Sequence, residues 1–163
     1  MQGMFRIGFG NDIHRLEAGR ELIIGGTLIT AEFGAVGHSD ADVLIHAVTD
    51  AVLGALALGD IGRHFSDSDS RWQNADSSLF LREALKMGMN RGYTVVNLDS
   101  VVSLEKPKLK EFIPQMRMNL AELLETEISN VSIKAKTGEG IESIGESRAV
   151  KAEACILLTK NQT

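Results

Sequence analysis

HSDADVLIHAVTDAVLGALALGDIG, residues 38–62, is the stretch of sequence that decides the fold. Ser39 and Asp40 are good N-cap residues, and the apolar residues that follow recur at spacings of three and four, as they do along one face of a helix. Gly59 interrupts this pattern, as a glycine beyond the last helical turn does. We therefore predict a half-buried helix that begins just after Asp40 and ends before Gly59.

A polar stripe accompanies the apolar face of this predicted helix. His46 lies one turn from Asp42 on one side and one turn from Thr49 and Asp50 on the other. A histidine in such a stripe is either solvated or hydrogen-bonded without binding a ligand, or it faces a pocket. His46 alone does not decide between these two interpretations.

A carboxylate and an imidazole stand two residues apart near the start of the chain. Residues 5–9 are predicted to form a strand, and the segment GNDIH that follows contains Asp12 and His14. On an extended backbone two such residues point to the same side, as metal ligands do. Two exposed polar residues at the end of a strand have the same spacing, so the pair needs a third partner before it identifies a site.

The rest of the chain alternates between strand and helix patterns. Gly25-Gly26 between two apolar runs predicts a β-hairpin, and Pro114 fits a helix only in its first turn or at a kink. The expected elements are hairpin strands over 22–24 and 27–29, helices over 77–91 and 109–126, and strands over 93–104, 131–137 and 149–158.

The composition is that of one soluble globular domain. The 163 residues are 44% hydrophobic and contain no linker-like or repeated segment, so we predict a single domain over 1–160 and a short disordered tail over 161–163. No apolar run approaches the roughly 20 residues that span a membrane. The net charge of −5 argues against nucleic-acid or anionic-membrane partners. Cys155 is predicted to be a small buried hydrophobic residue, and we expect a cytoplasmic location.

Two loops carry residues that suit a ligand. The loop over 60–69 is rich in Asp and Ser and could hold hydroxyl groups or a cation, or be a solvated turn region. The lysines over 105–110 could reach a phosphate, or form a solvated basic loop. His64 and Trp72 have no evident partner in the sequence and are expected to be surface or packing residues.

Four dispersed segments together resemble the 2-C-methyl-D-erythritol 2,4-cyclodiphosphate synthase family of the non-mevalonate isoprenoid pathway. They are GNDIH (10–14), GHSDADVLIHAVTDAVLGALALGDIG (37–62), KPKLKEFIPQMR (106–117) and KAKTGEG (134–140). The resemblance implies an α/β fold, an α+β sandwich in which helices pack on one face of a four-stranded mixed sheet. It also implies a homotrimer with active sites between subunits.

The reaction that the resemblance implies is an internal phosphoryl transfer. In 4-diphosphocytidyl-2-C-methyl-D-erythritol 2-phosphate the 2-phosphate attacks the β-phosphate, which yields the cyclic diphosphate and releases CMP. Positioning and charge neutralisation dominate such a transfer, so a lyase of this kind needs no protein nucleophile.

The resemblance also assigns roles to residues of this chain. Asp12, His14 and His46 would bind Zn²⁺ with a fourth position open, and Glu139 would bind a second divalent ion, Mg²⁺ or Mn²⁺. His38 and Thr137 would stabilise the transition state. The implied substrate-binding residues are Asp12, His14, His38, Ser39, Asp60, Ile61, Gly62, Phe65, Ser66, Asp67, Ser68, Asp69, Leu104, Glu105, Lys106, Pro107, Lys108, Leu109, Lys110, Lys136, Thr137, Gly138 and Glu139.

The chain departs from the family pattern at three positions that line the trimer axis. Asn11 and Ser143 stand where many relatives have Phe, and Glu146 stands where they have Arg, although a shift of two residues would let Arg148 take that place. We therefore expect a more polar axial cavity without the isoprenoid diphosphate that some relatives bind. Ser66, where many relatives have Pro, should only loosen the substrate loop.

Two other functions fit parts of this pattern. A non-catalytic sensor could bind a nucleotide through the metal and keep these motifs, but the intact Thr137 and Glu139 count against it. A zinc hydrolase would need a general base beside the metal, for which the sequence offers only ordinary acidic loop residues.

Overall fold

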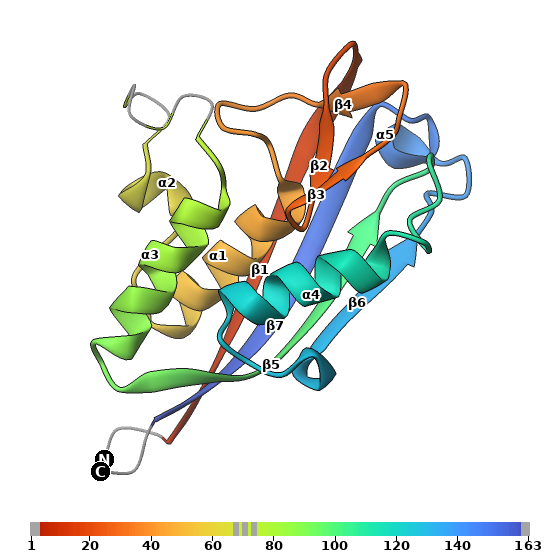
Figure 1. The fold of residues 1–163 in the computed structure, drawn as a ribbon. Helices are drawn as coiled ribbons and strands as arrows, with labels where there is room; N and C mark the ends of the chain where they lie inside the picture. The colour runs from red at the N-terminus through yellow and green to blue at the C-terminus, as the bar shows by residue number, and fades with distance from the viewer. Residues whose placement is uncertain (1–3, 67–68, 70–71, 73–74, 161–163) are drawn as a thin grey trace.

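A five-stranded mixed sheet forms one layer of the molecule, and the long helices cover one of its faces (Figure 1). The structure, a computed structural model, describes residues 4–66, 69, 72 and 75–160. The strand order is β4-β1-β7-β5-β6, in which β5 and β6 are parallel and the other neighbours antiparallel. These strands are β1 (Phe5–Ala18), β4 (Phe33–Ala35), β5 (Tyr93–Ser103), β6 (Val131–Lys136) and β7 (Ala149–Lys160).

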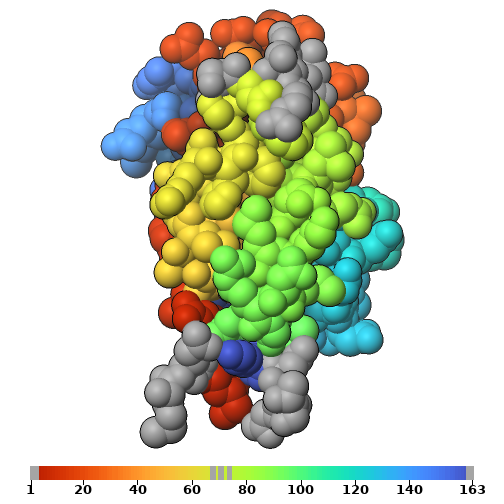
Figure 2. All heavy atoms as spheres, turned by 90° about the vertical axis from the view of Figure 1, so that its left-hand side faces the viewer, coloured from red at the N-terminus to blue at the C-terminus, as the bar shows by residue number. Residues whose placement is uncertain are grey.

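The helices and a separate hairpin complete the fold. The short strands β2 (Leu22–Ile24) and β3 (Thr27–Ile29) pair only with each other, as the Gly25-Gly26 turn predicts. Figure 2 shows the side of the molecule on which α2 and α3 lie together. The helices are α1 (Val43–Ala55), α2 (Ile61–His64), α3 (Ser78–Met89), α4 (Ile113–Leu123) and α5 (Glu142–Gly145), with a 3₁₀ turn η2 (Ile128–Asn130).

The predicted four-stranded sheet is wrong by one strand. β4 pairs with the end of β1, with Leu16 opposite Ala35, and adds a fifth strand at the edge. A three-residue strand is too short to show an alternating pattern, and Gly34 made the segment resemble a loop. β1 is also much longer than residues 5–9, so Asp12 and His14 lie within a strand rather than at its end.

Helix α1 packs unusually close to β1 because two glycines of the strand leave room for it. A Cβ on Gly8 would lie 1.8 Å from the Ala51 carbonyl oxygen, and one on Gly10 would lie 2.1 Å from the Ala47 carbonyl oxygen. The helix backbone therefore rests on the strand itself. This close approach brings His46 of α1 next to the even-numbered side chains of β1.

The N-cap of α1 is Asp42, not Ser39 or Asp40 as predicted. Its buried carboxylate accepts the backbone N–H groups of Leu44 and Ile45, and also those of Gly25 and Gly26 in the hairpin turn. Burial raises the pKa of Asp42 to about 6, although these backbone donors oppose the rise. The side chain thus joins the start of α1 to the β2–β3 hairpin.

The predicted polar stripe of α1 divides into two parts. Asp42 and Thr49 are fully buried, and the Thr49 hydroxyl donates to the Ile45 carbonyl oxygen at 2.8 Å. His46 and Asp50 face a cavity. Periodicity placed the four residues on one side of the helix. It could not show that the rest of the protein would bury Asp42 and Thr49 on that side.

The predicted helices over 77–91 and 109–126 and the strands over 93–104, 131–137 and 149–158 are present with shifted ends, whereas the short elements α2, α5 and η2 were not predicted. Pro114 lies in the first turn of α4, as expected. Cys155 is only partly buried, so the prediction that it belongs to the core is wrong: in β7 it points to the face of the sheet opposite Ala154 and Ile156. Within the described residues no helix is both long and apolar enough to cross a bilayer. The tail predicted over 161–163 lies outside the described residues.

Candidate metal centre and substrate cavity

Three side chains from two elements converge on one point. Asp12 and His14 extend from the helix-covered side of β1, and His46 extends from α1 toward them. The Asp12 Oδ2 atom lies 2.9 Å from His14 Nε2 and 2.9 Å from His46 Nδ1, and the two ring nitrogens are 3.1 Å apart. The third partner that the sequence required for the Asp12–His14 pair is therefore His46.

The chemistry of these three atoms suits a cation. His14 Nδ1 lies 3.0 Å from the Val36 carbonyl oxygen, which can only accept, so this nitrogen carries the proton. In the neutral ring His14 Nε2 is therefore unprotonated and can offer its lone pair to a cation. Two imidazoles and one carboxylate are the ligand types of a catalytic zinc site that keeps one position open. The residues present fit a divalent metal of this kind.

Electrostatics within the cluster keep Asp12 ionised. Burial raises its pKa, but hydrogen bonds with His14 and His46 outweigh this effect and hold the pKa of Asp12 well below its ordinary value. Burial also lowers the pKa of His14, and the Asp12 carboxylate more than reverses this, so the net shift is upward. The two shifts favour an ionised Asp12 beside a protonated His14, and a bound divalent cation would take the place of that proton.

A cavity of about 360 Å³ opens beside the cluster. Asp50 on its wall accepts the Ile61 backbone N–H at 2.7 Å, which ties α1 to the start of α2. Three aromatic rings form another wall, with Phe65 centred 4.9 Å from Phe80 and 5.4 Å from Trp72. The cavity is lined by Asp12, His14, Gly37, His38, Ser39, His46, Asp50, Ile61, Gly62, Phe65, Trp72 and Phe80.

The residues expected around the acidic loop fall into three groups. Ile61, Gly62 and Phe65 line the cavity together with His38 and Ser39. Asp60 instead caps α2 by accepting the Arg63 backbone N–H at 2.9 Å, and Ser66 and Asp69 are not part of the lining. Asp67 and Ser68 lie outside the described residues.

The lysine-rich loop and the KAKTGEG segment form a second hollow of about 300 Å³. The Thr137 hydroxyl donates to Glu139 Oε1 at 2.7 Å, and the Gly138 backbone N–H donates to Glu105 Oε2 at 3.0 Å. The hollow is lined by Leu104, Lys108, Leu109, Lys110, Ala135, Lys136, Thr137 and Glu139. Lys106 and Pro107 belong to the same loop but do not line the hollow. One chain therefore does not bring the two groups of predicted residues into one cavity.

Sequence reasoning missed several residues of the metal cavity. Asp50 was placed on the correct face of α1 but given no role, and Trp72 was expected to be a surface or packing residue. Ser77 is fully buried with its Oγ 2.8 Å from His46 Nε2. Its only signal in the sequence was its position at the start of a predicted helix. His64, in contrast, contacts the Leu58 carbonyl oxygen at 3.0 Å and lies away from the metal ligands.

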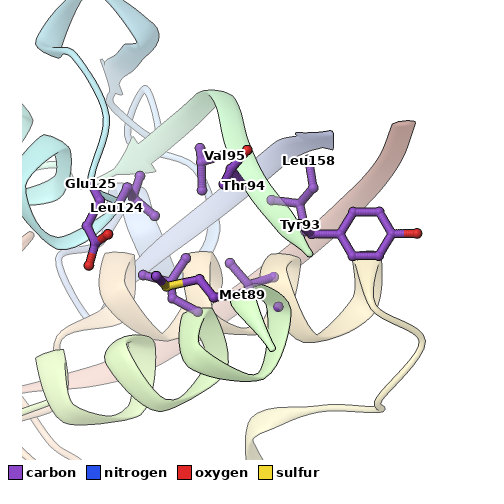
Figure 3. Close-up of a pocket in the computed structure, with 10 residues that line it drawn as sticks. Met89, Tyr93, Thr94, Val95, Leu124, Glu125 and Leu158 are labelled. Carbon is purple, nitrogen blue, oxygen red and sulfur yellow. The ribbon is translucent and has the colours of Figure 1, made fainter. Parts of the chain in front are cut away.

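A further apolar cavity of about 70 Å³ lies between α3 and the start of β5 (Figure 3). Met89, Val95, Leu124 and Leu158 line it, with Glu125 at its edge. It lies toward the ends of the sheet strands that are remote from Asp12 and His14. Its size is that of a packing defect, since a cavity of about 150 Å³ is needed for even a benzene-sized ligand.

The chain is similar to proteins of known activity over nearly its full length. The model of the YgbB family matches residues 5–159. A 2-C-methyl-D-erythritol 2,4-cyclodiphosphate synthase of Solibacter usitatus is 52% identical over 95% of this chain and 98% of its own. A solved structure of such a synthase with CDP bound aligns with a TM-score of 0.87 and 40% identity, over 94% of this chain and 99% of that one. A CDP complex of the Plasmodium falciparum protein has a TM-score of 0.87 at 32% identity, over 99% and 100% of the two chains.

Proposed function

This chain belongs to the YgbB family, and from that membership we infer that it catalyses the reaction of its relatives, the 2-C-methyl-D-erythritol 2,4-cyclodiphosphate synthases. It is a phosphorus–oxygen lyase of isoprenoid synthesis that converts 4-diphosphocytidyl-2-C-methyl-D-erythritol 2-phosphate to the cyclic diphosphate and CMP. The observation that carries this conclusion is the convergence of Asp12, His14 and His46 beside a cavity in a fold that matches the CDP-bound synthase. The family match over 5–159 supports treating 1–160 as one domain.

Zn²⁺ is the metal that we assign to Asp12, His14 and His46. The ligand types and their separations of 2.9–3.1 Å support it. Glu139 in the second hollow is assigned to Mg²⁺ or Mn²⁺, which take a single carboxylate when a substrate diphosphate supplies further oxygens. When bound, such ions neutralise negative charge on the phosphoryl group that is transferred.

The residues around the two hollows position the substrate. In the transfer the 2-phosphate oxygen bonds to the β-phosphorus while the bond between the β-phosphorus and the CMP oxygen breaks. His38 and Thr137 are assigned to stabilise this transition state as hydrogen-bond donors. The cavity with Ser39, Ile61, Gly62 and Phe65 would hold the methylerythritol phosphate, and the hollow with Lys108, Lys110 and Lys136 would hold the cytidine diphosphate.

A homotrimer with active sites between subunits reconciles these two hollows. The face of β1 opposite the helices exposes large apolar side chains: Ile7 is 71% exposed, Phe9 60% and Ile13 54%. Exposed apolar side chains gathered on one strand face, interrupted only by Asn11, suit an interface with another chain. Covering this face with a second copy would let the metal cavity of one subunit meet the lysine-lined hollow of its neighbour. We also place the enzyme in the cytoplasm, which a free Cys155 supports.

The test is turnover of the cytidyl substrate by the purified full-length chain. With Zn²⁺ and Mg²⁺ present, we expect CMP release and a cyclic diphosphate signal in ³¹P spectra, and both should stop after chelation. Glu139→Gln, which keeps the side chain's size, should lower turnover strongly. Tight binding of the substrate without CMP release would overturn the enzymatic assignment in favour of a nucleotide sensor.

A further inference from the structure

A buried hydrogen-bond chain leads from the metal-facing histidine of α1 into the protein. Ser77 lies at the start of α3, thirty-one residues from His46 in sequence, and is fully buried. Its Oγ is 2.8 Å from His46 Nε2. The same hydroxyl contacts Asp40 Oδ1, and the Ser77 backbone N–H donates to Asp40 Oδ2 at 3.1 Å. His46, Ser77 and Asp40 thus form one continuous chain.

The direction of each hydrogen bond in this chain can be worked out from the number of protons. Ser77 Oγ carries a single proton, and the ionised carboxylate of Asp40 can only accept, so Ser77 donates to Asp40. The contact between Ser77 Oγ and His46 Nε2 then needs a proton from His46. Nε2 therefore carries a proton in this arrangement, which leaves Nδ1 as the nitrogen that can bind a metal ion. Ser39 Oγ, at 3.1 Å from Nε2, is a second acceptor for the same N–H.

The chain is anchored on both sides. The Asp40 backbone N–H donates to the Ala75 carbonyl oxygen at 3.1 Å, and Asp40 Oδ1 also accepts the Asp42 backbone N–H at 3.2 Å. The segment before α1 and the segment before α3 are thereby held together across the end of the cavity. This explains why Asp40 does not cap α1: its carboxylate is directed at Ser77 instead.

We propose that Asp40 and Ser77 are positioning residues that fix the tautomer and the ring orientation of His46, so that Nδ1 is presented to the metal ion. The inference rests on the metal site proposed above and adds two residues to it that line neither the metal cavity nor the second hollow. A histidine that binds a metal is oriented by the group that its other ring nitrogen contacts. Here that group is a hydroxyl whose own proton is committed to a carboxylate.

Zinc affinity of three full-length variants tests this role, measured by competition with a chelator of known affinity. Ser77→Ala removes the acceptor and should weaken zinc binding by roughly 10–100-fold. Asp40→Asn keeps the shape but replaces one of two acceptor oxygens with an NH₂ group and removes the charge, which weakens the hold on the Ser77 proton and lets it point at His46 Nε2. This favours the wrong tautomer, so we expect a loss of about tenfold or more. Ser78→Ala, the same change one residue later, should bind zinc like the wild type.

The position of the proton on His46 is a readout that a purely structural role would not move. In the metal-free wild type at a pH where the ring is neutral, ¹⁵N spectra of the imidazole should show the proton on Nε2. Ser77→Ala should shift it toward Nδ1, which can donate to Asp12. A wild-type ring protonated on Nδ1 would overturn the proposal even if the variants failed to fold.

The possible failures are distinguishable. Suppose that the wild type binds zinc and converts the cytidyl substrate normally. If Ser77→Ala and Asp40→Asn then retain full zinc affinity, the positioning role is wrong and the proposed function stands. If the wild type binds no zinc, the positioning role and the proposed zinc-dependent function are both overturned.

Discussion

At the scale of single residues, His46 completes the proposed zinc site because Asp12 and His14 of β1 offer two ligand atoms and α1 supplies the third. His46→Ala should therefore lower zinc affinity by about 100-fold or more, which exceeds the effect of removing a group that only orients a ligand. The measurement is the metal content of the purified protein after gel filtration. His64→Ala is the matched control, since that ring contacts the Leu58 carbonyl oxygen instead. Full zinc occupancy in His46→Ala would exclude the ligand set.

Lys108 should affect substrate binding rather than zinc binding, because it is an exposed charge in the second hollow, away from the proposed metal ligands. Lys108→Ala should raise KM about tenfold and leave kcat within about a factor of three, since a mobile ammonium attracts the diphosphate equally before and during the transfer. Steady-state kinetics separate the two constants. Lys86→Ala, which removes another exposed lysine, on α3, should change neither. A large fall in kcat with unchanged KM would place Lys108 in the transition state instead.

At the scale of elements, the site depends on how closely α1 lies on β1. Gly8→Ala would place a Cβ 1.8 Å from the Ala51 carbonyl oxygen, so the helix must move away, and we expect a loss of about 3 kcal/mol in the free energy of unfolding. Gly88→Ala is the opposite case. Its Cβ would lie 3.4 Å from Leu56 Cδ1, at the edge of the small apolar cavity, and should stabilise α3 by roughly 0.5–1 kcal/mol. Urea denaturation of both variants measures the difference, and equal midpoints would show that the close packing is not needed.

The elements also show how far the sequence determines the site. Spacing along one element was enough to predict that Asp12 and His14 share a side of β1 and that His46 and Asp50 share a side of α1. Contacts between elements left no local pattern: Ser77 meets His46 across 31 residues, and Asp42 is drawn into the core by the hairpin N–H groups of Gly25 and Gly26. The metal triad was predicted only because the family resemblance joined two separate segments.

At the scale of the whole molecule, two of the residues that depart from the family pattern, Ser143 and Glu146, lie at a third hollow. Ser143 and Arg148 line it together with Ile13 and Arg15, and Arg148 forms an ion pair of 2.6 Å with Glu146. If this hollow faces the trimer axis, the pairing of Arg148 with Glu146 and the lack of an aromatic side chain at Ser143 should prevent it from retaining an isoprenoid diphosphate. Mass spectrometry of the protein purified from cells that make isoprenoids should find none bound. A copurified isoprenoid diphosphate, present at one per trimer, would contradict this expectation.

The proposed trimer can be tested through the separation of the two hollows within one chain. Variants His46→Ala and Glu139→Gln each disable a different hollow, so each should be inactive as a homotrimer. In mixed trimers, one subunit can supply an intact metal cavity and its neighbour an intact lysine-lined hollow. Random assembly of equal amounts in a closed three-fold ring makes about one site in four fully intact, and the mixture should recover about a quarter of wild-type activity.

Co-expression of the two variants with different affinity tags provides these mixed trimers for the CMP assay. The matched control combines His46→Ala with Asp12→Ala, which damage the same hollow and leave no site intact in any arrangement. Recovery in the first mixture and none in the second requires active sites shared between neighbouring subunits. If neither mixture recovers activity while the subunits do associate, each chain must build its site from its own residues. The apolar strip of Ile7, Phe9 and Ile13 would then join subunits for a reason other than catalysis.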